Sequence, residues 1–247
     1  MFPLRKTLKK PRKKPSLPNG VRIYAVGDVH GRADLLDPIL LRIRKDFMAS
    51  PAPRAVQVFL GDYIDRGPAS RAVLDRFTTR LHVMETVFLK GNHEAFMEAF
   101  LESPSVLSDW RQYGGLETLT SYGLYPSLNP NATEQLELAN ALRTRLPAAH
   151  LNFLRSLRPS FSCGDFFFVH AGVKPGVPLS DQREEDLLWI RDEFLLYEHS
   201  FGKIVVHGHT PVREPEIRSN RINIDTGAYA TGHLTCIRIE GDSIAFI

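Results

Sequence analysis

The chain has 247 residues, of which 43% are hydrophobic and 24% are charged, and this composition predicts a globular protein. The length fits one large domain, or one domain with an inserted cap. No apolar run is long enough to cross a membrane, and no apolar segment follows the charged N-terminus as in a secretory signal, so we expect a cytoplasmic protein. The two cysteines, Cys163 and Cys236, lie in unrelated contexts and are expected to be free thiols.

The formal net charge of +3 comes from the N-terminus. Seven lysines and arginines and no acidic residue lie in the first 14 positions, which leaves 24 basic and 28 acidic residues in the rest of the chain. Four prolines in the first 18 residues disfavour a helix, and little in this segment can be buried. We predict a disordered basic arm over residues 1–20, able to make weak contacts with anionic surfaces such as nucleic acid or lipid, and a folded domain over 21–247.

Three apolar segments open the predicted domain, and each is followed by a polar cluster and then by a helical pattern. They span residues 21–26, 55–60 and 86–89. Strands that alternate with helices predict a βαβαβ arrangement with a parallel sheet. Ligands of such sheets bind beyond the carboxyl ends of the strands, where these polar clusters fall.

The middle of the chain, from about residue 95 to 160, has a different pattern. Residues 134–146 have helical periodicity and residues 121–131 have a loop-like composition, so we predict a mostly helical cap. Strands are expected to return further on, the last two as a hairpin around the Gly-Asp pair at 241–242. They are expected in the segments DFFFVHAG, KIVVHGHT, RINIDTG, LTCIRIE and SIAFI.

Polar side chains gather directly after the predicted strands. They are Asp28, His30, Asp62, Asp65, Asn92, His93, His170, His207 and His209. Burying several carboxylates and imidazoles together is costly unless cations neutralise them. Oxygen and imidazole ligands without thiolates suit Mn, Fe or Zn, and the ligands exceed one coordination sphere. The pattern therefore predicts two divalent metal ions that share a bridging carboxylate.

The motifs GDVHGR, GDYIDRG, GNHE, HAG and GHT follow one another in this order. Together they resemble the metallophosphoesterases, and specifically the bacterial and phage branch of the phosphoprotein phosphatase family. The resemblance runs from about residue 22 to 230. It implies an α/β fold of the αββα type, in which two mixed sheets are flanked by helices, together with the helical cap.

The resemblance also implies a role for each matching residue. Asp28 and His30 would bind the first metal, Asp62 would bridge, and the second metal would be bound by Asn92, His170 and His209. His93 would be the proton donor, oriented by Asp65. His207 matches no ligand position and is expected to pack behind the site.

Four residues are implied as contacts of the substrate phosphate. They are Arg66, Arg191, Asn92 and Lys90. Many members carry an arginine where this chain has Lys90, so that the charge is kept and the bidentate fork is lost. The C-terminal signature of eukaryotic Ser/Thr phosphatases is replaced here by NIDTGAYATGHLT, so substrate preference does not transfer.

The chemistry expected of this site follows from charge. The two metals, with Mn²⁺ favoured and Fe or Zn as alternatives, and Arg66 and Arg191 would neutralise the phosphate. A bridging water of lowered pKa would attack phosphorus in line, and His93 would protonate the leaving oxygen. We expect a phosphomonoesterase that acts on phosphorylated proteins or peptides, with phospho-Ser/Thr or phospho-Tyr as substrate.

Two other functions are weighed against the phosphoprotein phosphatase. A hydrolase of dinucleoside polyphosphates, such as diadenosine tetraphosphate, would have similar motifs, but those relatives usually lack the equivalent of Asp65 and have aspartate in place of Glu94. A non-catalytic binding module of the same fold would have degraded ligand positions, and none is degraded here. The segment around Tyr229 to His233 and the cap are expected to shape the pocket.

Overall fold

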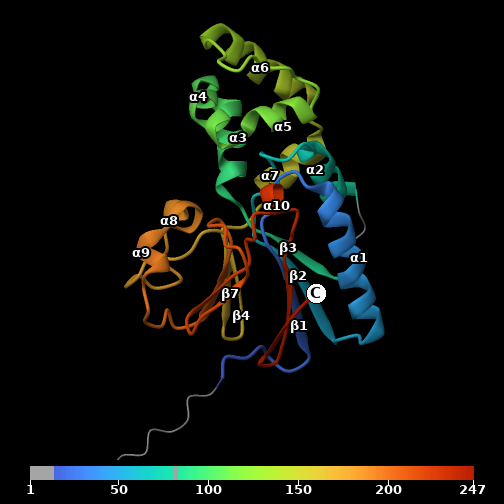
Figure 1. Cartoon of the computed structure of the whole chain (residues 1–247), viewed down its shortest axis with the longest axis vertical. Coiled ribbons are helices and arrows are strands. Elements are labelled where there is room, and N and C mark those ends of the chain that lie inside the picture. The colour runs from blue at the N-terminus through green and yellow to red at the C-terminus, as the bar shows by residue number, and fades with distance from the viewer. Residues whose placement is uncertain (1–13, 80–82) are drawn as a thin grey trace, which may run out of the picture.

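The structure is a computed structural model that describes residues 14–79 and 83–247. Two five-stranded sheets face each other, and helices cover their outer faces (Figure 1). The strand order is β10-β9-β1-β2-β3 in the first sheet and β4-β5-β6-β8-β7 in the second. Each sheet combines parallel and antiparallel pairs, so the expected αββα sandwich of two mixed sheets is confirmed.

The strands have the following bounds. The first sheet contains β1 (Val21–Val26), β2 (Arg54–Phe59), β3 (Glu85–Phe88), β9 (Cys236–Glu240) and β10 (Ser243–Phe246). The second contains β4 (Ser160–Cys163), β5 (Phe166–Val169), β6 (Ile204–His207), β7 (Glu216–Ile217) and β8 (Arg221–Asn223). β1, β2 and β3 run parallel, and β9 and β10 form the expected hairpin. Two short strands at the edges of the second sheet, β4 and β7, were not predicted.

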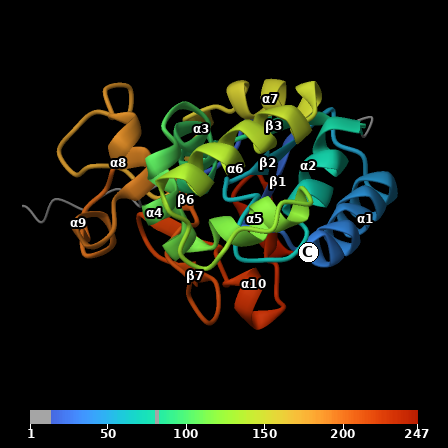
Figure 2. The same ribbon diagram turned by 90° about the horizontal axis from the view of Figure 1, so that it is seen from above.

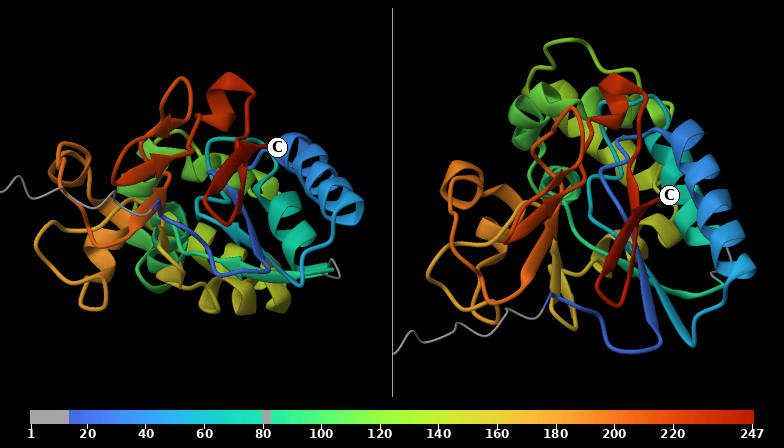
Figure 3. Two further views of the ribbon diagram at one scale, coloured as in Figure 1. Left: turned by 90° about the horizontal axis from the view of Figure 1, so that it is seen from below. Right: turned by 60° about the horizontal axis from the view of Figure 1, so that its bottom comes forward.

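The helices fall into three groups. Helices α1 (Ala33–Ala49) and α2 (Ser70–Thr79) cover the first sheet, whereas α8 (Glu184–Trp189) and α9 (Asp192–Leu195) lie outside the second (Figure 3). The third group forms the cap above the sheets (Figure 2). It contains α3 (Asn92–Glu102), α4 (Leu107–Trp110), α5 (Gly115–Ser121) and α6 (Ala132–Arg145), with 3₁₀ turns at Pro104–Val106 and Arg111–Tyr113. Helix α7 (Ala148–Arg155), at the end of the predicted cap, packs instead beside α2 on the first sheet, where Phe153 contacts Phe77 and Phe88. A short α10 (Ala228–Thr231) lies near the start of α1, where the Ala228 carbonyl accepts a hydrogen bond from Arg32 Nη1 at 2.9 Å.

Strand β1 explains why the fold has layers. Its six residues are all buried, as in a strand covered on both faces. Ile23 and Ala25 belong to the core between the two sheets, whereas Tyr24 and Val26 belong to the core between the first sheet and its helices. The alternation of side chains along a strand therefore supplies both cores from one segment. Within the described residues, no helix has the length and apolar character needed to span a membrane.

The end of the predicted basic arm differs from the expectation. Residues 1–13 lie outside the described residues, but Leu17 is only 3% exposed and belongs to the core between the sheets. Its N–H donates to the Gly241 carbonyl at 2.8 Å, and the Ser16 N–H donates to Asp165 Oδ2 at 2.9 Å. The arm therefore does not extend to residue 20, because Leu17 has an apolar side chain that the core can bury.

Candidate active site

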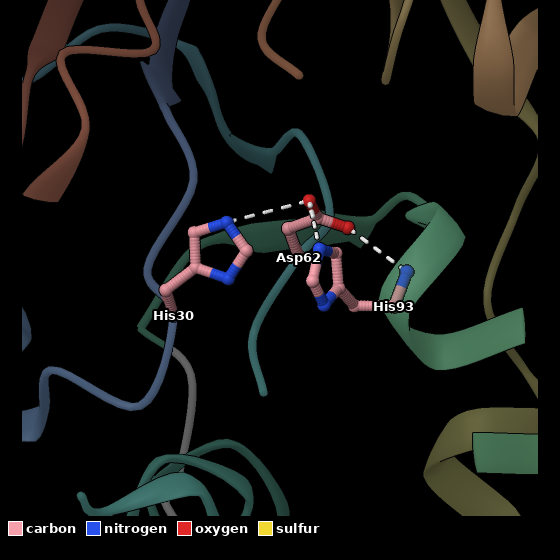
Figure 4. Close-up of side chains that lie close together, drawn as sticks. All are labelled: His30, Asp62 and His93. Carbon is pink, nitrogen blue, oxygen red and sulfur yellow. Dashed lines mark hydrogen bonds and ion pairs between the residues drawn. The ribbon is translucent and has the colours of Figure 1, made fainter. Parts of the chain in front are cut away.

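The predicted site residues come together where six strands end. Loops after the carboxyl ends of β1, β2 and β3 in the first sheet meet those after β5, β6 and β8 in the second. Two buried groups of metal-ligating atoms lie there, and Asp62 belongs to both. One group also contains His30 and His93 (Figure 4), and the other contains His170 and His209. A carboxylate common to two clusters is the arrangement expected of a bridging ligand.

The backbone of the site is strained. Among the described residues, the non-glycine residues with positive φ are all in these loops: His30, Asp62, Asp65, Arg66 and His209, with φ from 45 to 71°. Left-handed conformations cost energy for such residues and persist only where surrounding contacts enforce them.

The Glu94 side chain makes several of the contacts that hold these loops in their strained conformation. Its carboxylate is fully buried and accepts the N–H groups of Asp62 at 2.9 Å, Tyr63 at 2.7 Å and Gly91 at 3.0 Å. It thereby ties the loop after β2 to the start of α3. A side chain at Gly91 would collide with Asp62 Oδ1, 2.2 Å from the position of its Cβ, which explains the glycine in GNHE.

The first cluster presents a free imidazole nitrogen to Asp62. His30 Nδ1 donates to the Ile64 carbonyl at 3.0 Å, and a carbonyl can only accept, so the neutral ring carries its proton on Nδ1. His30 Nε2 then has a free lone pair 3.5 Å from Asp62 Oδ2. Burial lowers the pKa of His30 to about 3, so the ring is neutral and suited to bind a metal.

The second cluster brings polar side-chain atoms of four residues close together. His170 Nδ1 donates to the Leu60 carbonyl at 3.0 Å, which leaves Nε2 unprotonated. That nitrogen lies 2.9 Å from Asn92 Oδ1, 3.2 Å from His209 Nδ1 and 3.3 Å from Asp62 Oδ1. His170 Nε2 and Asp62 Oδ1 are both acceptors, so their lone pairs face each other at 3.3 Å and favour a cation between them.

Asp28 gives a second reason to expect a cation. Its Oδ2 accepts the His209 N–H at 3.0 Å, while Oδ1 and His209 Nε2 are buried without a hydrogen-bond partner. Burial, together with the charges of Asp225 and Asp62, raises the pKa of Asp28 well above its usual value. The residues present therefore fit two divalent cations, which would neutralise the carboxylates and lower the pKa of water.

His93 is held by a carboxylate that the cap holds in turn. Its Nδ1 donates to Asp65 Oδ2 at 2.7 Å, and the fully buried Asp65 also accepts from Trp110 Nε1 at 2.6 Å and Thr118 Oγ1 at 2.5 Å. Burial alone lowers the pKa of His93, but the Asp62 and Asp65 carboxylates outweigh it and hold the pKa above its usual value. The ring is thus able to carry a proton on Nε2 at neutral pH.

The predicted phosphate contacts have different surroundings. The Arg66 guanidinium lies 4.6 Å from the centre of the Tyr229 ring, whose edge is directed at His30 with the centroids 5.3 Å apart. Arg191 is exposed, with Nη1 3.5 Å from Thr210 Oγ1.

Lys90, by contrast, is paired with acidic side chains. Its Nζ lies 2.7 Å from Glu98 Oε2 and 3.1 Å from Glu184 Oε1. Two carboxylates satisfy its charge, so its geometry does not support the phosphate contact expected from its place before GNHE.

Sequence reasoning missed several residues of the site. Trp110 and Thr118 come from the cap, and no pattern in the sequence indicates that they contact Asp65. Asp225 follows β8, is 2% exposed and accepts the Gly227 N–H at 2.8 Å. Its position directly after the RINI segment was the signal that could have revealed it.

His207 is fully buried and packs edge-on against Phe194, with ring centroids 4.9 Å apart.

These features define the class of protein. The profile of the calcineurin-like phosphoesterase family matches residues 21–235, and the chain belongs to that family. It is therefore a metallophosphoesterase, a hydrolase of phosphate esters. The likeness to the phosphoprotein phosphatases in particular is not confirmed by this match.

The chain is also similar to individual bacterial proteins over most of its length. The chain is 27% identical over 241 residues to the bis(5'-nucleosyl)-tetraphosphatase PrpE (asymmetrical) of Anoxybacillus flavithermus, which covers 86% of this chain and 88% of that protein. It is 29% identical over 236 residues to the protein of the same name from Bacillus velezensis. That match covers 86% of this chain and 87% of the Bacillus velezensis protein.

Solved structures share the fold. A structure described as "a putative diadenosine tetraphosphatase" superimposes with a TM-score of 0.60 at 20% identity and covers 96% of this chain and 95% of its own. A cold-active protein tyrosine phosphatase superimposes with a TM-score of 0.55 at 16% identity. The match covers 93% of this chain and 80% of the phosphatase chain. At these identities the likeness extends to the fold alone.

Proposed function

We propose that the chain is a metal-dependent hydrolase of dinucleoside polyphosphates. The observation that carries this proposal is the similarity, over 86% of the chain, to proteins named asymmetrical bis(5'-nucleosyl)-tetraphosphatases. In an asymmetrical cleavage, water adds across one P–O–P bridge of a dinucleoside tetraphosphate. The products are a nucleoside triphosphate and a nucleoside monophosphate.

Each residue of the site would have one role in metal binding, phosphate binding or proton transfer. Asp28, His30 and Asp62 would hold one metal, and Asp62, Asn92, His170 and His209 would hold the other. Arg66 and Arg191 would bind the phosphate oxygens, and His93 would donate its Nε2 proton to the departing oxygen. Asp65 would keep the His93 ring in the required tautomer.

The sequence favoured a phosphoprotein phosphatase on the strength of Asp65 and Glu94, and the structure weakens that argument. Glu94 is fully buried and its carboxylate accepts backbone N–H groups of two loops, so its role is to hold the loops together. Asp65 Oδ2 accepts the His93 Nδ1 proton at 2.7 Å, so it acts through His93. Glu94 therefore does not distinguish a nucleotide substrate from a phosphopeptide, and Asp65 bears on that choice only through the proton donor that it orients.

One observation still supports phosphomonoesterase activity as a second function. The His93 and Asp65 pair provides a proton donor, which matters most when the leaving group is a basic alkoxide such as that of serine. A nucleotide phosphate is a far better leaving group and needs the proton less. The pair therefore favours some activity on phosphoserine or phosphothreonine.

A side-by-side assay tests both functions. The purified protein with added Mn²⁺ is incubated with diadenosine tetraphosphate and with phosphoserine, phosphothreonine and phosphotyrosine peptides. We expect ATP and AMP in equal amounts from the dinucleotide, at a higher kcat/KM than for any peptide. Production of ADP alone would contradict the asymmetrical cleavage, and turnover of peptides only would make the chain a phosphoprotein phosphatase.

A further inference from the structure

A hollow of about 360 Å³ lies beside the candidate active site and is not used by the chemistry described above. We call it the aromatic hollow. Its lining comes from α3, from the cap segment 109–113 and from α8. The residues are Phe96, Asp109, Gln112, Tyr113, Glu185 and Trp189.

Three aromatic rings form its walls. Phe96 and Tyr113 stack, with centroids 5.1 Å apart and planes 28° apart, and Trp189 stands nearly perpendicular to Phe96 at 5.3 Å. Tyr113 is 39% exposed, and Trp189 is partly exposed. Single exposed rings are common on protein surfaces, but a contiguous group of partly exposed aromatic rings is a candidate binding site.

The same elements that build the active site place these rings next to it. The Tyr113 ring centre is 6.2 Å from that of His93, and the Trp189 ring centre is 6.3 Å from that of His209. Phe96 follows His93 by three residues on α3 and so lies on the same helix face. A group in the hollow would therefore adjoin a phosphate bound at the active site.

The polar residues of the hollow exclude a phosphate and fit a base. Asp109 and Glu185 are exposed carboxylates, and within the part of the chain that the structure describes neither forms an ion pair. Carboxylates repel phosphate but accept hydrogen bonds from the amino groups and ring N–H groups of purines. Gln112 adds an amide that both donates and accepts. Aromatic faces stack with any base, and most strongly with large ring systems.

We propose that the aromatic hollow binds the purine base of a nucleotide whose phosphate lies in the active site, with the base stacked on Trp189 or Tyr113 and its amino group directed at Asp109 or Glu185. This inference rests on the proposed function. It adds that the base, and not the phosphate chain alone, selects the substrate.

A matched pair of ligands tests the inference without relying on turnover. AMP and ribose 5-phosphate carry the same sugar and phosphate and differ only in the base. Their dissociation constants are measured by calorimetry with the Mn²⁺-loaded protein. We expect AMP to bind about 10-fold to 100-fold more tightly, the range that stacking of one base supports.

Variants then locate the base. Trp189→Ala should bring the affinity for AMP towards that for ribose 5-phosphate, and Trp189→Phe should restore most of the difference because it restores an aromatic face. Tyr125→Ala removes an aromatic ring that is 84% exposed on the cap and outside the hollow, and it should leave the difference unchanged. Because each variant is judged by the ratio of two ligands, a general loosening of the site does not imitate the expected result.

Equal affinities for AMP and ribose 5-phosphate in the wild type would overturn the inference, as would an unchanged ratio in Trp189→Ala. Preferential binding of an arginine-containing phosphopeptide, abolished by Trp189→Ala, would instead make the hollow a peptide site and would also overturn it. Base-dependent binding of AMP without hydrolysis of diadenosine tetraphosphate would refute the proposed function and leave the hollow as a nucleotide site.

Discussion

The indole N–H of Trp110 donates a 2.6 Å hydrogen bond to Oδ2 of Asp65, and both side chains are fully buried. The same oxygen accepts the His93 Nδ1 proton at 2.7 Å. The cap therefore fixes the carboxylate that fixes the proposed proton donor. Catalysis and cap packing are linked through one oxygen atom.

The role of His93 as a proton donor predicts a dependence on the leaving group. His93→Ala should reduce turnover of a phosphoserine peptide by roughly 10²–10⁴-fold, the usual scale of general acid catalysis. The loss should be clearly smaller for p-nitrophenyl phosphate and diadenosine tetraphosphate, whose leaving groups are acidic. Steady-state kinetics on the three substrates, with metal content checked, measures this. Equal losses with metals retained would leave His93 as a phosphate or water contact.

Removing the Trp110 hydrogen bond should weaken the same step. Trp110→Phe keeps an aromatic ring in the core but leaves Asp65 with one donor fewer, and hydrogen bonds to charged groups contribute about 1.5–3 kcal/mol. We expect kcat for phosphoserine to fall by about 10-fold or more, with p-nitrophenyl phosphate less affected. Thr118→Val, which removes the other donor, should give the same pattern. Uniform losses on both substrates would show that the cap merely supports the fold.

The buried acidic groups predict how the metal-free protein responds to pH. Burial, with a contribution from the Asp62 charge, raises the pKa of Glu94 to about 8. Between its unfolded value near 4.5 and about 8 the folded state keeps a proton that the unfolded chain has lost, so the contribution of Glu94 to stability falls as the pH rises through this window. Histidines with lowered pKa values, such as His30 and His207 at about 3, act in the opposite direction only below about pH 6.5.

Thermal unfolding of the metal-free protein measures this effect. We expect a lower Tm at pH 8.0 than at pH 6.5, and a smaller difference once Mn²⁺ is added, because cations beside Asp62 favour ionised Glu94. Glu94→Gln, which does not titrate, should make the fall smaller, and the part due to the raised pKa values of Asp28 and His93 should remain. A metal-free Tm that stays constant or rises between these two pH values would contradict the expectation.

Leu17 predicts where the folded part of the chain begins. Because its side chain is 3% exposed in the core between the sheets, Leu17→Ala should destabilise the protein by about 2–5 kcal/mol. For a chain of this size that lowers the Tm by roughly 5–15 °C. Leu128→Ala, at a leucine that is 81% exposed, is the matched control and should change the Tm little. Similar melting curves for the two variants would show that residues 14–20 do not stabilise the body.

The sequence predicted the parts of the site that follow strands, and the structure shows why. Asp28, Asp62 and Asn92 come after parallel neighbours, and the carboxyl ends of parallel strands meet at one edge whatever the rest of the chain does. The hairpin was predicted from the Gly-Asp turn at 241–242, and the pair of sheets only from the resemblance to the metallophosphoesterases.

The remainder depends on how separate elements dock, which no local pattern encodes. Trp110 and Trp189 reach the site because the cap and α8 pack beside α3. Lys90 lies next to the GNHE motif in sequence, yet it pairs with Glu98 and Glu184. The short strand β4 has no distinctive composition and is defined by its pairing with β5.

Metal stoichiometry tests the central claim, a centre of two metals joined by Asp62. Elemental analysis of active wild-type protein should find two divalent ions per chain. Asp62→Asn should lower the occupancy of both sites, whereas His209→Ala should empty chiefly one and leave about one ion bound. A single ion or none in the active wild-type protein, or an Asp62→Asn variant that retains one full site, would contradict the account.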